Sequence, residues 1–287
     1  MDQKIELRQV RGFGELVNDT FAFSKQNLKP LLYSILVICG FFFIAQTISA
    51  VFQAITMNDA IAQGDIKNPS RIFTWEYAIN AIFSSLFYSS IALTVFCYIK
   101  LYLENGNQAP EVQEVWSEFK QFFWRFFGCN ILLGIVVIIG FALCLLPGIY
   151  LLPIISLISA IIVFENSSFL YAFDRGFRLI KNNWWVTFGA LVIIFIIVGA
   201  ASMIVVLPVT FIATGTLLFT KVSMSGPILI VSTILSSLVQ VFMLLPYVLI
   251  SLSYFSLVEG KDGEGLMDRV NNIGNSGSDS NLPEEQY

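Results

Sequence analysis

Residues 186–200 read VTFGALVIIFIIVGA, a run with no charged or amide side chain. It follows ENSSFLYAFDRGFRLIKNNWW at residues 165–185, where two acidic and three basic side chains lie close together. An apolar helix of roughly 20 residues spans the hydrocarbon core of a bilayer. Long apolar runs that alternate with short charged stretches therefore predict an all-α, polytopic membrane protein.

The composition of the whole chain supports this prediction. Of its 287 residues, 56% are hydrophobic and only 13% are charged, whereas a soluble domain carries about 25% charged residues. We therefore expect the lipid bilayer to be the main partner of the surface. No basic arm or basic helix lies outside the membrane-flanking segments, so we expect no nucleic-acid partner.

Six apolar runs predict six transmembrane helices. The expected spans are residues 30–57, 75–103, 122–146, 148–165, 184–213 and 226–258. They form a membrane domain over residues 30–258, between a cytoplasmic amphipathic segment at 1–29 and a disordered acidic cytoplasmic tail at 259–287. The fourth run is the shortest and holds Pro153, so a re-entrant segment remains an alternative to a full span. Pro208 and Pro246 predict kinks in the two long runs, and Pro147-Gly148 predicts the turn between spans three and four.

The basic residues are unevenly divided among the connections. Thirteen Lys and Arg residues flank one set of connections, which includes both terminal segments, and three flank the other set. Connections rich in Lys and Arg stay in the cytoplasm. We therefore expect both termini on the cytoplasmic side.

The polar stretch before residue 184 predicts an amphipathic helix in the headgroup plane. Phe169, Phe173 and Phe177 recur at helical spacing, and Asp174 is placed to pair with Arg178 one turn later. Two further segments precede pairs of spans, with apolar faces made of Val112, Val115, Trp116, Phe119, Phe122 and Phe126, and of Phe13, Leu16, Val17 and Phe21. The chain is thus expected to form three hairpins, each preceded by a cytoplasmic interfacial amphipathic helix.

Residues that carry chemistry are sparse. The chain has no histidine, which removes the commonest general acid–base group and the commonest metal ligand. Its four cysteines lie in or beside apolar runs without CxxC spacing. No nucleotide-binding or hydrolase motif occurs. We therefore expect no enzyme and no catalytic, cofactor-binding or metal-binding residues.

Two groups of polar residues carry the candidate interactions. Arg175, Arg178 and Lys181 are candidate contacts for anionic lipid headgroups, because each basic side chain near the membrane surface contributes on the order of 1 kcal/mol. Gln46, Gln53, Asn80, Asn130 and Gln240 lie within the expected spans. They either form hydrogen bonds between helices or line a neutral polar path. The spacings Ser85/Ser89 and Ser156/Ala160 indicate close helix packing.

The run LLPGIYLLPIISLISAIIVFENSSFLYAFDRGFRLIKNNWWVTFG at residues 145–189 resembles the membrane-domain family fused to some glycerophosphoryl diester phosphodiesterases. It is also similar to related uncharacterised six-span bacterial proteins of the Bacteroidetes type. The residues that carry the resemblance are Glu165, Ala172, Arg175, Gly176, Lys181 and Trp184. The resemblance implies a bacterial inner-membrane location. It implies no phosphodiesterase activity, because the chain has no such catalytic domain.

Two functions remain open. We expect a non-catalytic integral membrane protein that acts as a membrane scaffold or as an accessory subunit to a membrane protein partner. The alternative is a permease or lipid-handling protein with a neutral polar path. Inner amides that converge on one cavity would favour the alternative, whereas a dry core would favour the scaffold. An intramembrane enzyme is the weakest hypothesis, since no nucleophile–base pair or metal cluster is visible.

Overall fold

The computed structural model describes residues 4–62, 74–220 and 226–263, and within them all regular structure is helical. The elements are α1 (Phe13–Gln26), α2 (Leu28–Ala62), α4 (Trp75–Glu104), α5 (Val112–Leu143), α6 (Leu145–Phe164), α7 (Phe169–Ile180), α8 (Trp184–Thr220), α9 (Gly226–Val239), η2 (Gln240–Met243) and α10 (Leu244–Asp262). The described residues contain no strand. The prediction of an all-α protein is confirmed.

Six helical stretches are long and apolar enough to cross a membrane. They are Leu28–Ala60, Trp75–Glu104, Val112–Leu143, Leu145–Phe164, Trp184–Pro208 and Gly226–Asp262. Their number and order match the six predicted runs, so the chain is a multi-pass membrane protein by helix length and composition. Most of the predicted disordered tail, residues 264–287, lies outside the described residues, and α10 continues four residues past the predicted end of the last span.

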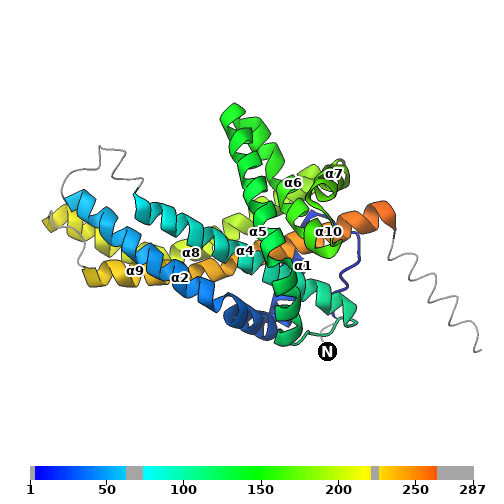
Figure 1. Cartoon of the computed structure of the whole chain (residues 1–287), viewed down its shortest axis with the longest axis horizontal. Helices are drawn as coiled ribbons and strands as arrows, with labels where there is room; N and C mark the ends of the chain where they lie inside the picture. The colour runs from blue at the N-terminus through cyan, green and yellow to red at the C-terminus, as the bar shows by residue number, and fades with distance from the viewer. Residues whose placement is uncertain (1–3, 63–73, 221–225, 264–287) are drawn as a thin grey trace, which may run out of the picture.

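The helices form two arms that diverge from a common base (Figure 1). In one arm α2 packs against α4 and α9, and α8 packs against α9. In the other arm α5 packs against α6, and the far ends of both helices project away from the rest. The core lies at the base, where α10 packs against α1, α4, α6, α7 and α8. There α10 is buried without interruption from Val248 to Glu259.

The second predicted amphipathic segment is not a separate helix. It is continuous with the third span in α5, which runs from Val112 to Leu143. Val115, Phe119 and Phe126 of the predicted apolar face are buried in the protein, but Trp116 of the same face is 42% exposed. The helix has no reason to break, because residues 112–127 contain neither Gly nor Pro and the buried stripe continues at helical spacing into the span.

The predicted turn at Pro147-Gly148 is wrong by three residues. The helix breaks at Cys144, whose backbone is extended with φ −171° and ψ 153°, and α6 begins at Leu145. Pro147 therefore lies in the first turn of α6, where its missing N–H removes no helical hydrogen bond. Gly148 packs against the opposing helix, since a Cβ there would come 2.5 Å from Cδ1 of Phe141.

The last membrane-crossing stretch is interrupted just before Pro246, as its proline predicts. The 3-10 segment Gln240–Met243 joins α9 to α10. Pro246 has no N–H to bond the carbonyl of Phe242, which weakens the regular α-helical pattern at this point. By contrast, α8 continues through Pro208 to Thr220 without a break in the helix.

The first amphipathic segment forms α1, but its buried face differs from the predicted one. Leu16 and Phe23 are buried, with Thr20 and Ser24 beside them, against the base of the bundle. Phe13 and Phe21, which were expected on the same apolar face as Leu16, are 42% and 37% exposed. The helix therefore packs a mixed face on the protein and presents aromatic rings outward.

A buried arginine fixes the segment that precedes α1. The Arg11 side chain is fully buried, and its Nε donates to Oδ2 of Asp19 at 2.8 Å. Its guanidinium also donates to the carbonyl oxygens of Leu7 at 2.8 Å, Gln9 at 3.2 Å and Glu6. The Arg11 backbone N–H donates to Oγ of Ser256 on α10 at 2.8 Å. Arg11 is one of the thirteen basic residues whose distribution predicted the cytoplasmic side, and its burial was not predicted.

Candidate functional site

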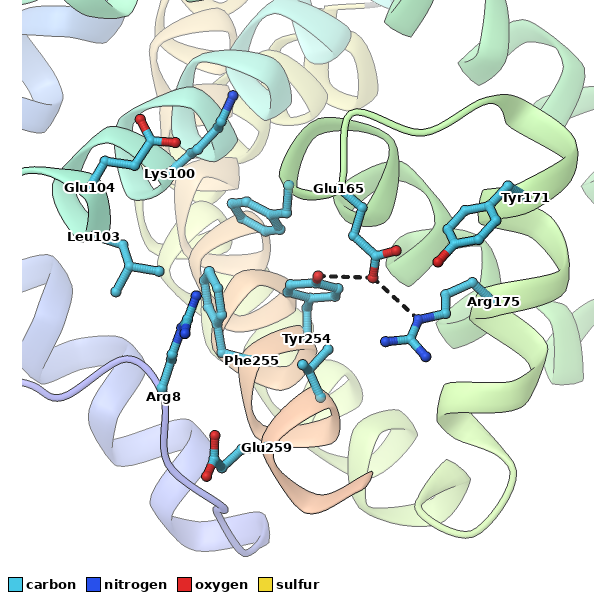
Figure 2. Close-up of a pocket in the computed structure, with 12 residues that line it drawn as sticks. Arg8, Lys100, Leu103, Glu104, Glu165, Tyr171, Arg175, Tyr254, Phe255 and Glu259 are labelled. Atoms are coloured by element: carbon cyan, nitrogen blue, oxygen red, sulfur yellow. Dashed lines mark hydrogen bonds and ion pairs between the residues drawn. The ribbon is translucent and has the colours of Figure 1, made fainter. Parts of the chain in front are cut away.

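A pocket of about 660 Å³ opens at the base of the bundle (Figure 2). Its walls are the ends of α4, α6, α7 and α10, together with the segment that precedes α1. We call it the charged pocket, because six of its lining residues carry charge: Arg8, Lys100, Arg175, Glu104, Glu165 and Glu259. Phe164, Tyr254 and Phe255 also line it, and the Phe164 ring packs on the Tyr254 ring at a centroid distance of 5.0 Å.

Glu165 joins three elements at one wall of the charged pocket. It follows the last residue of α6, and its Oε1 accepts a hydrogen bond from the Tyr254 hydroxyl of α10 at 3.0 Å. The same oxygen accepts from Nε of Arg175 on α7 at 3.3 Å. Arg175 Nη2 also pairs with Asp262 at the end of α10. Figure 2 shows the Tyr254 hydroxyl and the Arg175 guanidinium both directed at this carboxylate.

The pKa values at this wall follow from these contacts. Partial burial works to lower the pKa of Arg175, but its hydrogen bond to Asp262 and the charge of Glu165 outweigh burial and hold that pKa above its usual value. The negative charge of Glu165 and a hydrogen bond to it raise the pKa of Tyr171. Arg175 therefore stays charged and Tyr171 stays neutral at physiological pH.

An ion pair and further hydrogen bonds hold the helices around the charged pocket. Lys100 Nζ lies 3.3 Å from Oε2 of Glu118 and 5.1 Å from the ring centroid of Phe122, so α4 is tied to α5. Arg125 of α5 donates to Oδ1 of Asn166 at 3.0 Å and to the carbonyl oxygen of Ser167. These bonds fix the link between α6 and α7 and so help to position Glu165.

The three predicted lipid contacts occupy different settings. Arg175 lines the charged pocket and pairs with Glu165 and Asp262. Arg178 pairs with Asp174 at 3.1 Å, as its spacing predicts, and its side chain is 62% exposed. Lys181 is exposed in the turn between α7 and α8. The structure therefore does not bring the three together into one site, and their contact with lipid stays a prediction.

A second cavity, of about 350 Å³, lies among α4, α5, α6 and α10. We call it the hydroxyl-lined cavity, because seven of its lining residues carry a hydroxyl or amide group: Ser85, Tyr88, Ser89, Asn130, Ser156, Ser159 and Tyr247. No charged residue lines it. Asn130 Oδ1 accepts a hydrogen bond from Ser159 at 3.2 Å, which joins α5 to α6. Sequence reasoning had assigned Ser85, Ser89 and Ser156 to helix packing, and their spacing alone carries no signal of a cavity.

The other predicted intramembrane amides do not reach this cavity. Asn80 donates to Oε1 of Gln53 and accepts from Ser49 at 3.1 Å, so these residues join α2 to α4. The Oε1 atoms of Gln46 and Gln240 are buried, and neither has a hydrogen-bond partner in the described part of the chain. Of the five predicted amides, Asn130 is the one that lines the hydroxyl-lined cavity in the described part of the chain.

No metal site emerges within residues 4–62, 74–220 and 226–263. There, no three Cys, Asp or Glu side chains are grouped closely enough to hold a metal ion. Cys39 instead shares a hydrogen bond with Thr94 at 3.4 Å between α2 and α4.

Comparison with known proteins yields one family. Residues 124–254 match the family described as DUF7847, a domain of unknown function. The matched part begins within α5 and ends within α10, so it contains most of the hydroxyl-lined cavity and one wall of the charged pocket. No curated protein and no solved structure matches the chain. The resemblance to the phosphodiesterase-associated membrane domain stays a prediction.

Proposed function

We propose that the chain is a non-catalytic integral membrane protein that acts as a scaffold or accessory subunit. The outer half of the α5–α6 pair carries this proposal. Ile138, Leu143 and Leu146 there are 68%, 77% and 73% exposed, and Figure 1 shows this part projecting from the bundle. Exposed apolar patches of this kind are typical of surfaces that bind lipid or protein. Beyond Tyr150, which contacts Trp184, the ends of α5 and α6 offer a membrane protein partner an exposed apolar surface.

Residue-specific photo-crosslinking in living cells tests this role. A benzophenone amino acid at Ile138 or Leu146 should give a discrete adduct with a second membrane protein, identified by mass spectrometry. The control position is Ile196 on α8, which is also apolar and is 60% exposed, and which should label lipid alone. Adducts with lipid alone at all three positions would contradict the scaffold proposal.

The proposed setting is the bacterial cytoplasmic membrane, with six spans in three hairpins and both termini in the cytoplasm. The uneven division of basic residues supports this threading. The amphipathic segments would lie at the cytoplasmic surface, with Arg178 and Lys181 facing anionic headgroups. Arg175 would act there mainly through its pairs with Glu165 and Asp262, which hold α7 against the bundle.

We also propose that the chain catalyses no reaction. The absence of histidine from the sequence supports this, because hydrolases of the resembled family need catalytic histidines. Purified protein should show no hydrolase or oxygenase activity. Reproducible phosphodiesterase turnover that a single substitution in this chain abolishes would overturn this part of the proposal.

The second candidate function is a permease or lipid-handling protein with a neutral polar path. The hydroxyl-lined cavity favours it, since seven hydroxyl or amide residues converge there at the depth of the spans. Polar groups in such positions commonly mark the path of a transported molecule. Proteoliposomes that contain the chain should then take up glycerol faster than protein-free liposomes, as measured by stopped-flow light scattering. Equal rates would contradict this candidate.

A further inference from the structure

A layer of aromatic rings separates the hydroxyl-lined cavity from the charged pocket. Phe96 lines the cavity, whereas Phe164 and Phe255 line the pocket. The ring centroid of Phe96 lies 5.8 Å from that of Phe164, and that of Phe164 lies 4.9 Å from that of Phe255. Phe96 also lies 6.0 Å from Tyr247, on the cavity side. The rings therefore form one continuous contact from the cavity to the pocket.

This layer is thin along the helix axes. Phe96 of the cavity and Lys100 of the charged pocket are four residues apart on α4, which is about 6 Å at 1.5 Å per residue. Ile250 and Tyr254 have the same separation on α10. The two spaces are therefore separated by little more than the packed rings themselves.

We propose that the hydroxyl-lined cavity and the charged pocket are two compartments of one route through the bundle, which the rings of Phe96 and Phe164 close. The route carries a small neutral solute that bears several hydroxyl groups, such as a polyol or a small sugar. This inference rests on the permease candidate and adds to it a substrate class and a barrier.

The lining of the cavity argues for a neutral, hydroxyl-bearing solute. Serine and tyrosine hydroxyls both donate and accept hydrogen bonds, so together they match a polyol. Asn130, Ser156 and Ser159 already donate to groups of the bundle, so they offer a solute acceptor oxygens. An ion that entered this cavity would lose its hydration and would find no side chain of opposite charge there. Such a transfer carries a high free-energy cost at the depth of the spans. In the charged pocket, three basic and three acidic side chains balance each other. Its net charge therefore selects neither cations nor anions.

The barrier can be tested by the accessibility of one engineered cysteine. The four natural cysteines, Cys39, Cys97, Cys129 and Cys144, are replaced by alanine, and Ser89→Cys places a thiol in the hydroxyl-lined cavity. In inside-out vesicles, a membrane-impermeant maleimide should label this thiol slowly from the cytoplasmic side. Adding Phe96→Ala should raise the labelling rate roughly tenfold. A tenfold rise corresponds to a free-energy barrier for access that is lower by about 1.36 kcal/mol.

The matched control is Phe87→Ala in the same background. Phe87 is a buried phenylalanine on the same helix, but it lines neither the cavity nor the charged pocket. Its removal should leave the cytoplasmic labelling rate unchanged. If Phe96→Ala leaves the rate unchanged, or if Phe87→Ala raises it equally, the barrier is not where we place it. Variants are compared only when their elution from gel filtration matches that of the parent.

Solute flux separates failure of the barrier from failure of transport. In proteoliposomes Phe96→Ala should raise the rate of erythritol uptake roughly tenfold and leave potassium uptake at the protein-free level. Uptake of potassium with erythritol would contradict the assigned solute class. If cytoplasmic labelling rises but erythritol does not enter, the permease candidate fails while the barrier stands. If the parent transports erythritol and Phe96→Ala changes neither the labelling rate nor the uptake rate, the proposed barrier is contradicted and the permease candidate is not.

Discussion

At the scale of single residues, one buried charge holds the segment before α1 to the membrane bundle. Arg11 is the clearest case, because its side chain is fully buried and bonds Asp19 and three backbone carbonyls. Arg178 is the opposite case, with an exposed pair to Asp174 on one helix face. Both residues pair with aspartate, but only the first has no access to water.

Arg11→Met should therefore destabilise the protein strongly. It removes the charged partner of Asp19 and a donor to the carbonyls of Glu6, Leu7 and Gln9. Breaking a fully buried pair costs about 3–5 kcal/mol, and the 22% exposure of Asp19 places this loss toward or below the lower end. Arg178→Gln loses only a solvent-screened pair worth less than about 1 kcal/mol. Thermal unfolding of both variants in the same detergent measures the difference. Similar unfolding midpoints for the two would contradict the assigned role of Arg11.

At the scale of elements, the position of α7 is set by the small residues on its buried face. Ala172 and Gly176 are buried against the rest of the bundle, and α7 packs on α6. A Cβ on Gly176 would come 2.7 Å from Cγ1 of Ile158, which is itself fully buried. The half-buried Phe169, Phe173 and Phe177 lie beside this contact. Part of the amphipathic face therefore packs on protein.

Gly176→Ala should push α7 away from α6. The added methyl group overpacks a buried contact, which costs typically about 1–3 kcal/mol. Gly128→Ala is the matched control, because it lies within helix α5 and a Cβ there meets nothing within 4 Å. The control should be neutral or stabilising by about 0.5–1 kcal/mol. Thermal unfolding in detergent checks both, and a loss of equal size in the control would rule out the steric explanation.

Spin labels test whether α7 has one shielded side and one water-facing side, as the interfacial placement requires. Labels are attached at Phe173→Cys and at Arg178→Cys in the cysteine-free background. The label at 173 should be shielded from a water-soluble nickel relaxant, while the label at 178 should be accessible, since the Arg178 side chain is 62% exposed. Equal accessibility at the two positions would mean that α7 has no surface-facing polar side, against the interfacial placement.

At the scale of the whole molecule, the two arms share one base. The base holds the charged pocket and the buried part of α10. The twelve residues that line this pocket come from five separate parts of the chain. The proposed threading places this base at the cytoplasmic side of the membrane, with the diverging ends of the arms on the other side.

Reporter fusions test this threading directly. Two reporters are fused at each of two positions, after Ser225 and at the C-terminus. One is a phosphatase that is active only outside the cytoplasm, and the other is a fluorescent protein that is active only inside it. The two positions should give opposite results. After Ser225 the phosphatase fusion should be active and the fluorescent protein should not, because few basic residues flank that connection. The same response at the two positions would contradict six spans with both termini inside.

The sequence by itself was sufficient for the helical class and for the six membrane-crossing stretches. Hydropathy and helical period are local properties, so the runs around Ile193 and Ile138 identify helices without knowledge of their neighbours. The pair between Asp174 and Arg178 was predictable for the same reason, since one helical turn fixes its geometry. Pro246 marked the interruption before α10, whereas Pro208, with the same local signal, lies inside the continuous helix α8.

Only the tertiary structure decided which distant residues meet. Glu165 bonds Tyr254, 89 positions along the chain, and Arg11 bonds Ser256. The sequence around a charged residue beside a span looks the same in two cases. The side chain can face lipid headgroups, as predicted for Arg175, or it can form ion pairs inside a pocket. The spacing of Ser85 and Ser89 likewise suits a tight helix contact or a cavity wall. Which of these occurs depends on how the arms diverge, and that follows from the packing of the whole bundle at its base.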